Sequence, residues 1–323
     1  MNMLNKSEHL TRRDFMKGSV IGTMGLTLGV NGLWTITSDA QSTARSKVVV
    51  GKSENIIGSN NKVDQTIVEK VLDASMMKFT NTSSVDSAWK SLFSPKDKVG
   101  IKMNVMMTAT HEELVLAIVK NLTKIGIPDA NIFIWDRDRG GIGEKGVYNR
   151  NQSFGYHSNS LSNIIMEHAT ALINVPGVKS HWLSGIAVAV KNWVGAVTNI
   201  NTLDRDVVFV IHKNSCEDIG MIPALPEIKN KSRLVIADAI RPLFHGGPQV
   251  NPAYLWQNKE IMISTDPVSI DALCLQKIQE RRFKEKGAEW PLSPPPISVA
   301  AAEKKYNLGV SDLKRIDVER VEV

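Results

Sequence analysis

The chain has 323 residues, of which 42% are hydrophobic and 22% charged, an ordinary balance for a globular protein. Its formal net charge is +6 without any dense block of Lys and Arg among aromatic residues, which argues against nucleic-acid binding. The two cysteines, Cys216 and Cys274, are too few for an iron–sulfur cluster, which usually takes four thiolates. Because Cys274 lies in an apolar helical pattern, we expect two free thiols rather than a disulfide.

The first 40 residues have the pattern of an export signal. The pair Arg12 and Arg13 precedes a mildly apolar stretch at 19–34, which is too weak for a membrane span. This order predicts a twin-arginine signal in residues 1–40, with cleavage after Ala40, although a retained anchor is the alternative. We therefore expect a periplasmic protein with the twin-arginine machinery as a partner, and residues 41–323 as a single α/β domain.

The first half of that domain alternates strand and helix patterns. The pattern predicts a strand at 47–50, helices at 63–77 and 85–93, a strand at 99–105, a helix at 110–125 and a strand at 131–135. Thr110 and Glu113 have the spacing of a capping box at the start of the third helix. A Gly-, Asn- and Ser-rich stretch at 138–160 predicts a long loop, and loops of this length are often functional.

The second half continues the alternation. The pattern predicts a strand at 172–176, an apolar stretch at 185–197 with a helical run at 186–190, strands at 233–238 and 259–264, a helix from 265 to 284, a helix at 298–305 and a strand at 315–323. Asp266 before Pro267 predicts the cap of the long helix. Strand–helix–strand order implies parallel pairs with right-handed crossovers. The fold class is therefore α/β, with a mixed, largely parallel central sheet flanked by helices.

Polar residues stand at the carboxyl ends of three predicted strands. Lys102 and Asn104 follow one strand, Asp136 follows the next, and Asp238 ends a third. Ligands of open α/β sheets bind beyond these ends. We therefore expect these four residues to bind substrate.

A second group of polar residues follows the strand at 172–176. Lys179 and His181 are expected on a turn after it, and Lys191 and Asn192 interrupt an apolar run. A lysine in such a run extends to solvent, pairs with another group or faces a ligand. Asn192 is predicted to bind substrate; Lys179, His181 and Lys191 are predicted as catalytic residues, a structural role remaining the alternative for His181.

His212 and Cys216 are four residues apart and would share a face if they lay on a helix, where they could hold a soft metal. The other interpretations of His212 are proton transfer or substrate binding, and a structural role. Gly246 and Gly247 follow Asp238 in a loop, and glycines there would allow a ligand to approach the backbone.

These stretches together resemble the bacterial and archaeal family called domain of unknown function 362, over roughly residues 45–320. The resemblance is carried by residues 102–104, 176–181, 191–195, 233–238, 246–248 and 265–268, and by Asp271. Met103 stands where the family usually has Pro, and the ferredoxin-type cysteine motif of many relatives is missing. The resemblance implies a fold class and candidate positions, not a reaction, and the missing motif argues against electron transfer by this chain.

Two functions remain open from the sequence. The first is an exported enzyme that acts on a small anionic or carbonyl substrate, which Lys102, Lys179 and Lys191 would hold or polarise while His181 or His212 transfers protons. The alternative is a non-catalytic metal or cofactor carrier, or a maturation partner of an exported redox enzyme. The cofactor is unknown, and a bound metal fits either function.

Overall fold

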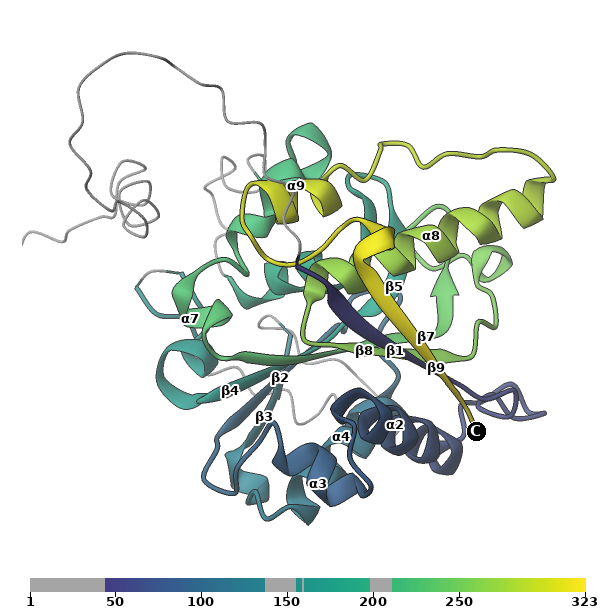
Figure 1. The fold of residues 1–323 in the computed structure, drawn as a ribbon. Coiled ribbons are helices and arrows are strands. Elements are labelled where there is room, and N and C mark those ends of the chain that lie inside the picture. Colours follow the sequence, from purple (N-terminus) through teal and green to yellow (C-terminus); the bar gives the residue numbers. More distant parts are fainter. Residues whose placement is uncertain (1–43, 137–154, 159, 198–210) are drawn as a thin grey trace, which may run out of the picture. The chain divides into compact units, whose positions relative to one another are not determined.

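The computed structural model describes residues 44–136, 155–158, 160–197 and 211–323. Within this part of the chain, nine strands form one sheet with the order β3-β2-β4-β7-β8-β1-β9, and β5 and β6 extend it beside β7 (Figure 1). The strands are β1 (Ser46–Lys52), β2 (Val99–Met103), β3 (Ile132–Trp135), β4 (Ala171–Val175), β5 (Gly177–His181), β6 (Gly185–Ala187), β7 (Ser232–Leu243), β8 (Glu260–Ser264) and β9 (Ile316–Glu322). The predicted signal at 1–40 lies outside the described residues.

The sheet is mixed and largely parallel, as the sequence predicts. Strands β3, β2, β4 and β7 are parallel neighbours, and β9 is parallel to β1. Strand β8 is antiparallel to both β7 and β1. Because parallel strands end at the same edge, β2, β3 and β4 bring the residues that follow them to one place.

Helices cover both faces of this sheet. The helices are α2 (Gln65–Thr80), α3 (Val85–Lys90), α4 (Glu112–Lys124), α5 (Ala189–Asn192), α7 (Pro226–Lys229), α8 (Pro267–Lys286) and α9 (Ser298–Lys304). In Figure 1, α2, α3 and α4 lie below the sheet, whereas α8 and α9 lie above it. Short 3-10 or π helices are η1 (Asp129–Asn131), η3 (Ile164–His168), η4 (Trp193–Ala196), η5 (Asn214–Met221), η6 (Pro252–Tyr254) and η7 (Leu313–Arg315).

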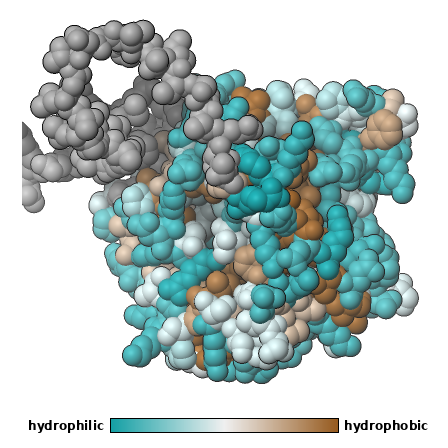
Figure 2. All heavy atoms as spheres, in the orientation of Figure 1, coloured by the Kyte–Doolittle hydropathy of each residue, from teal (hydrophilic) through white to brown (hydrophobic). Residues whose placement is uncertain are grey.

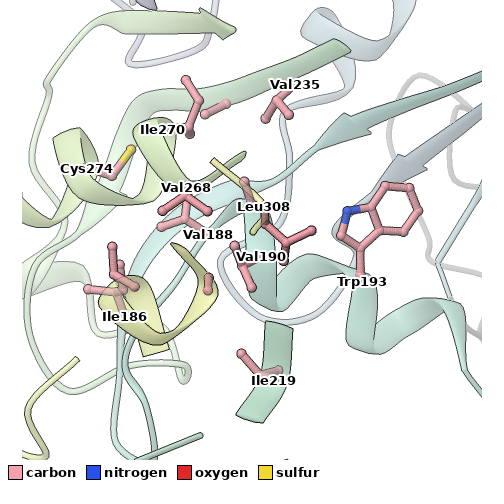
Figure 3. Packing of buried hydrophobic residues seen from close by; sticks show 14 of the residues in the cluster. Ile186, Val188, Val190, Trp193, Ile219, Val235, Val268, Ile270, Cys274 and Leu308 are labelled. Carbon is pink, nitrogen blue, oxygen red and sulfur yellow. The ribbon is translucent and has the colours of Figure 1, made fainter. Parts of the chain in front are cut away.

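Two apolar cores follow from the alternation of side chains along the strands. In β7, Ile236 belongs to the core beneath α2 and α4, whereas Val235 and Ala237 belong to the core beneath α8. Figure 3 shows Val188 and Val190 packed with Val268 and Ile270 in this second core. The short helix α5 is therefore held against the start of α8.

Hydrophobic residues on the face drawn in Figure 2 form a narrow stripe and scattered patches among hydrophilic ones. Across the described ranges, no helix combines the length and the apolar character that crossing a membrane requires. Both cysteines are buried and free, as expected.

One predicted helix cap is confirmed and one is wrong. The Asp266 carboxylate accepts hydrogen bonds from the backbone N–H groups of Val268 and Ser269, at 2.8 and 2.9 Å, at the start of α8. Thr110 does not cap α4, whose N-cap is His111. The Thr110 hydroxyl instead donates to the Val175 carbonyl oxygen at 2.7 Å and fixes the loop after β2 against the end of β4.

Three other predictions need correction. The run at 186–190 is not one helix, because it is divided between strand β6 and the start of α5. Lys179 and His181 lie in β5 rather than on a turn, since β5 pairs with both β6 and β7. Asp238 lies in the middle of β7, which continues to Leu243. Of the predicted loop at 138–160, residues 138–154 and 159 lie outside the described part.

Candidate functional site

A cavity of about 150 Å³ lies where β2, β3 and β4 end, between β5 and α5; we call it the site cavity. It is lined by Asn104, Met106, Met107, Asp136, Pro176, Gly177, Lys179, His181, Ala187, Val188, Lys191, Asn192, Val194, Gly195, His212 and Pro248. Seven residues that the sequence singles out are on this list: Asn104, Asp136, Lys179, His181, Lys191, Asn192 and His212. The two polar groups of the sequence, far apart along the chain, therefore meet in one site.

A buried ion pair lies at the base of the cavity. The Lys102 ammonium is 2.7 Å from the Asp136 carboxylate, and both side chains are almost fully buried. Lys102 also donates to the Met103 carbonyl oxygen at 2.8 Å, and Asp136 accepts from the Val105 N–H at 2.9 Å. Such a pair is costly to break, because removing one partner leaves a buried charge. Lys102 itself does not line the cavity and contacts it through Asp136, which does.

Two asparagines connect this pair to α5. Asn192 donates to the Lys102 carbonyl oxygen at 3.1 Å and to the Asn174 side-chain oxygen at 2.7 Å. Asn174, near the carboxyl end of buried β4, donates in turn to the Ala189 carbonyl oxygen at 2.8 Å. The network fixes α5, and with it Lys191, relative to the ends of β2 and β4.

Lys179 is 5% exposed, and two backbone carbonyls hold its amine. Its Nζ donates to the oxygens of Met106 and Thr108, at 3.1 and 3.0 Å. Within the described ranges no carboxylate oxygen lies within ion-pair distance of it. Burial lowers the pKa of Lys179 to about 7, and the charges of Lys102 and Lys191 act in the same direction, against that of Asp136. This amine can therefore lose and regain a proton near neutral pH.

His181, His212 and Lys191 form the other wall of the cavity. The two imidazole rings stack with their centroids 6.3 Å apart, and Lys191 Nζ is 3.1 Å from His212 Nε2. Burial and the nearby Lys191 charge hold the pKa of His181 far below its ordinary value, so this ring is neutral. Its Nδ1 accepts from the Leu183 N–H at 3.1 Å, which leaves Nε2 as the protonated nitrogen.

His212 and Cys216 do not have the helical arrangement that the predicted metal site assumes. Cys216 has a φ of 61° and Ser215 a φ of 54°, so His212 and Cys216 are not on one α-helix. Lys191 Nζ contacts both His212 Nε2 and the Cys216 sulfur, the latter at 3.9 Å, and so places a cationic group between the proposed ligands. Burial also raises the pKa of the Cys216 thiol. No cluster of three or more candidate ligands occurs in the ranges that the structure describes.

Asp238 lies away from the cavity lining and is bound to His111. Its Oδ2 accepts from the His111 backbone N–H at 2.6 Å and lies 2.8 Å from the ring Nδ1. Burial raises the pKa of Asp238, but His111 lowers it more, so the carboxylate is charged. Asp238 thus anchors the start of α4, and its role in substrate binding stays a prediction.

Gly246 and Gly247 do not line the cavity, but they allow the backbone conformation of their loop. A side chain on Gly247 would come within 2.0 Å of the Ser180 carbonyl oxygen, so only glycine allows this approach to β5. Gly246 has a φ of 74°, in the left-handed region that glycine favours. The neighbouring Pro248 is the residue of this loop that lines the cavity.

Several residues of the site lie outside the predicted set. Gly195 lets the chain pass directly over the buried pair, because a Cβ there would be 2.0 Å from Asp136 Oδ1. Asp271 of α8 accepts from the N–H groups of Ala189 and Val190, at 2.6 and 3.2 Å, at the start of α5. Asn174 was visible as a lone polar residue in an apolar strand, which is the signal that could have identified it.

The titratable side chains around the cavity are mainly basic ones. Lys179, Lys191 and the two histidines line it, and Asp136 is the one carboxylate among the lining residues in the described ranges. That carboxylate is engaged by Lys102. Such a surface favours a small anion, and a cavity of about 150 Å³ is known to accommodate a molecule the size of benzene.

Comparison with known proteins gives one family match. Residues 153–276 match the family model described as Domain of unknown function (DUF362). Neither the curated proteins nor the solved structures gave a match to the chain. The matched stretch runs from before β4 into α8 and contains Lys179, His181, Lys191 and His212, whereas Lys102 and Asp136 precede it. The chain is therefore similar to the DUF362 family over the part that supplies most of the basic side chains of the site cavity.

Proposed function

We propose that the protein is an exported enzyme that binds a small anionic or carbonyl-bearing substrate in the site cavity. The observation that carries this proposal is the buried Lys179 amine, held by two carbonyl oxygens on the wall of a basic cavity. A buried lysine with a lowered pKa is the kind that acts in proton transfer or as a nucleophile.

The other groups have roles that fit such a substrate. The Lys191 ammonium and the Nε2–H of His181 would hold the anionic end, since both residues line the cavity. Asp136 and Lys102 would keep the base of the cavity rigid, because their pairing is buried. Lys179 would exchange the proton that the reaction moves.

Ligand binding tests this proposal directly. Purified protein would be titrated with pyruvate, glyoxylate and acetate, and with acetamide as an uncharged analogue, by calorimetry and by thermal shift. We expect at least one carboxylate to bind and acetamide not to bind. Lys191→Met should weaken carboxylate binding at least about tenfold, the loss of one charge-assisted contact.

The matched control is Lys96→Met, because Lys96 is exposed and precedes β2, at the end of that strand away from the cavity. It should bind as the unaltered protein does. Equal binding of carboxylates by the Lys191 and Lys96 variants, or binding of none, would contradict the proposal. The carrier alternative of the sequence is tested by metal analysis of the exported protein, where tightly held stoichiometric metal without turnover would favour it.

A further inference from the structure

The hydrogen bonds of Lys179 define the direction of its free electron pair. Nζ donates to the carbonyl oxygens of Met106 and Thr108. The same two oxygens accept from the Asn104 side-chain amide, at 3.0 and 2.6 Å, which fixes their positions. A neutral amine has two N–H groups and one lone pair. When both N–H groups are donated, the lone pair is the remaining position on nitrogen, and Lys179 lines the site cavity.

We propose that the Lys179 amine is a nucleophile that forms an imine with the carbonyl carbon of a small α-keto acid in the site cavity. This inference rests on the proposed function and names its substrate class. Because the two carbonyl oxygens accept hydrogen bonds from Nζ, they orient the nitrogen before substrate binds. Such an arrangement suits a preorganised nucleophile.

The substrate class follows from the groups around the amine. An α-keto acid carries a carboxylate beside its reactive carbonyl, and the Lys191 ammonium and the His181 Nε2–H are donors of the cavity wall that could hold that carboxylate. Lys191 is near enough for its charge to lower the pKa of Lys179. The cavity of about 150 Å³ suits a ligand of about six heavy atoms, the size of pyruvate.

The step balances with the groups named. The Nζ lone pair forms a bond to the carbonyl carbon, and the carbonyl π electrons move to oxygen. One proton from Nζ and one proton from solvent or the Lys191 ammonium leave with that oxygen as water. The product is a protonated imine, which keeps one N–H for the Met106 or Thr108 oxygen. No oxidant or reductant takes part.

Reductive trapping tests this assignment on the full-length protein. The protein would be incubated at pH 7 with pyruvate and sodium cyanoborohydride, which reduces an imine to a stable secondary amine, and the labelled lysines would be identified by peptide mass spectrometry. A lysine with a pKa near 7 is about half neutral at this pH, against less than about one part in a thousand for an ordinary lysine. We expect Lys179 to be labelled at least about tenfold faster than exposed lysines of the same chain, such as Lys96.

Two further arms separate the imine from simple binding. Acetaldehyde has no carboxylate, so Lys191→Met should slow the labelling of Lys179 by pyruvate more than its labelling by acetaldehyde, which should slow only because the Lys191 charge no longer lowers the pKa of Lys179. Lys179→Arg keeps a donor for both carbonyls but cannot form an imine, and it should lose the label at this position without labelling elsewhere in the cavity.

Labelling of Lys179 no faster than that of exposed lysines would overturn the imine. If pyruvate still binds in that case, the proposed anion site stands and Lys179 has a structural or proton-transfer role. If no carboxylate binds and no label forms, both proposals fail together.

Discussion

Lys179 combines burial with a titratable amine, and this has a consequence for folding. In the native protein its pKa is about 7, because burial disfavours the charged form, whereas the unfolded chain has the ordinary value of 10.5. Between these two values the unfolded state binds a proton that the native state does not. The contribution of Lys179 to stability therefore rises as pH increases from about 7 to about 10.

We predict a measurable difference between the unaltered protein and Lys179→Met across this range. The free energy of unfolding of the unaltered protein should gain up to about 1.4 kcal/mol per pH unit relative to the variant. Chemical denaturation at pH 7, 8 and 9 would measure it. Lys96→Met serves as control and should follow the unaltered protein. Parallel curves for Lys179→Met would show that the buried amine has an ordinary pKa.

Gly195 is the second residue whose identity the site requires. Its position over Asp136 and Lys102 leaves no room for a methyl group, because an added Cβ would be 2.7 Å from Lys102 Nζ and closer still to the carboxylate. Neither partner can move without weakening a buried ion pair.

We predict that Gly195→Ala lowers the free energy of unfolding by about 1–3 kcal/mol or more, the usual cost of overpacking, and abolishes carboxylate binding. The control is Gly58→Ala, where the nearest atom, the side-chain oxygen of Asn60, is 3.1 Å from the added carbon. Denaturation and calorimetry would compare the two. Carboxylate binding that survives in Gly195→Ala would show that the ion pair does not shape the cavity.

At the scale of elements, the single turn of α5 is held from outside. It is too short to be stable alone, and Asp271 of α8 accepts from its first two N–H groups. Burial raises the pKa of Asp271 to about 7, although the two N–H groups favour the charged form. The position of Lys191 and Asn192 thus depends on a helix that does not line the cavity.

We predict that Asp271→Ala costs about 2–4 kcal/mol of stability, because two buried N–H groups lose their acceptor, and that it weakens carboxylate binding. Asp64→Ala is the matched control, since Asp64 caps the exposed start of α2. That change should cost about 1 kcal/mol and leave binding unaffected. Hydrogen exchange at Ala189 and Val190 would report the local loosening, and unchanged exchange would contradict this role of Asp271.

The same elements show what the sequence could and could not predict. The order and type of most elements were predictable, because long periodic stretches such as 63–77 and 265–284 carry their signal locally. Short elements such as α5 and β6 were not, since tertiary contacts rather than periodicity stabilise them. The Asp266 cap is confirmed because Asp–Pro determines it locally, whereas Thr110 is drawn away from its expected cap by the distant Val175 carbonyl.

The candidate site was predictable to the extent that it depends on strand ends. Asn104 and Asp136 reach the cavity for that reason, as do the residues that follow β4. Asp238 does not, because β7 continues past it to pair with β5. The hydrogen bonds that hold Lys179 were not visible, since backbone carbonyls leave no signature in a sequence.

At the scale of the whole molecule, the proposed function includes export to the periplasm. The pair Arg12 and Arg13 before a mildly apolar stretch is the basis for the proposal that the protein is exported by the twin-arginine route. This route carries proteins that have already folded. The residues that line the site cavity run from Asn104 to Pro248 along the chain, so the cavity exists only after most of the chain has folded. Export in the folded state would deliver the site complete.

We predict that replacing Arg12 and Arg13 by two lysines retains the protein in the cytoplasm. This change keeps the positive charge, so it tests the arginine pair rather than charge near the apolar stretch. Cell fractionation and immunoblotting would measure the distribution, with Lys6→Arg as a control that should be exported normally. Because the route requires folding, Gly195→Ala should also reach the periplasm in smaller amount than Gly58→Ala. Equal periplasmic amounts of the double-lysine variant and the unaltered protein would rule out this route, while the carboxylate site could still be tested in purified protein.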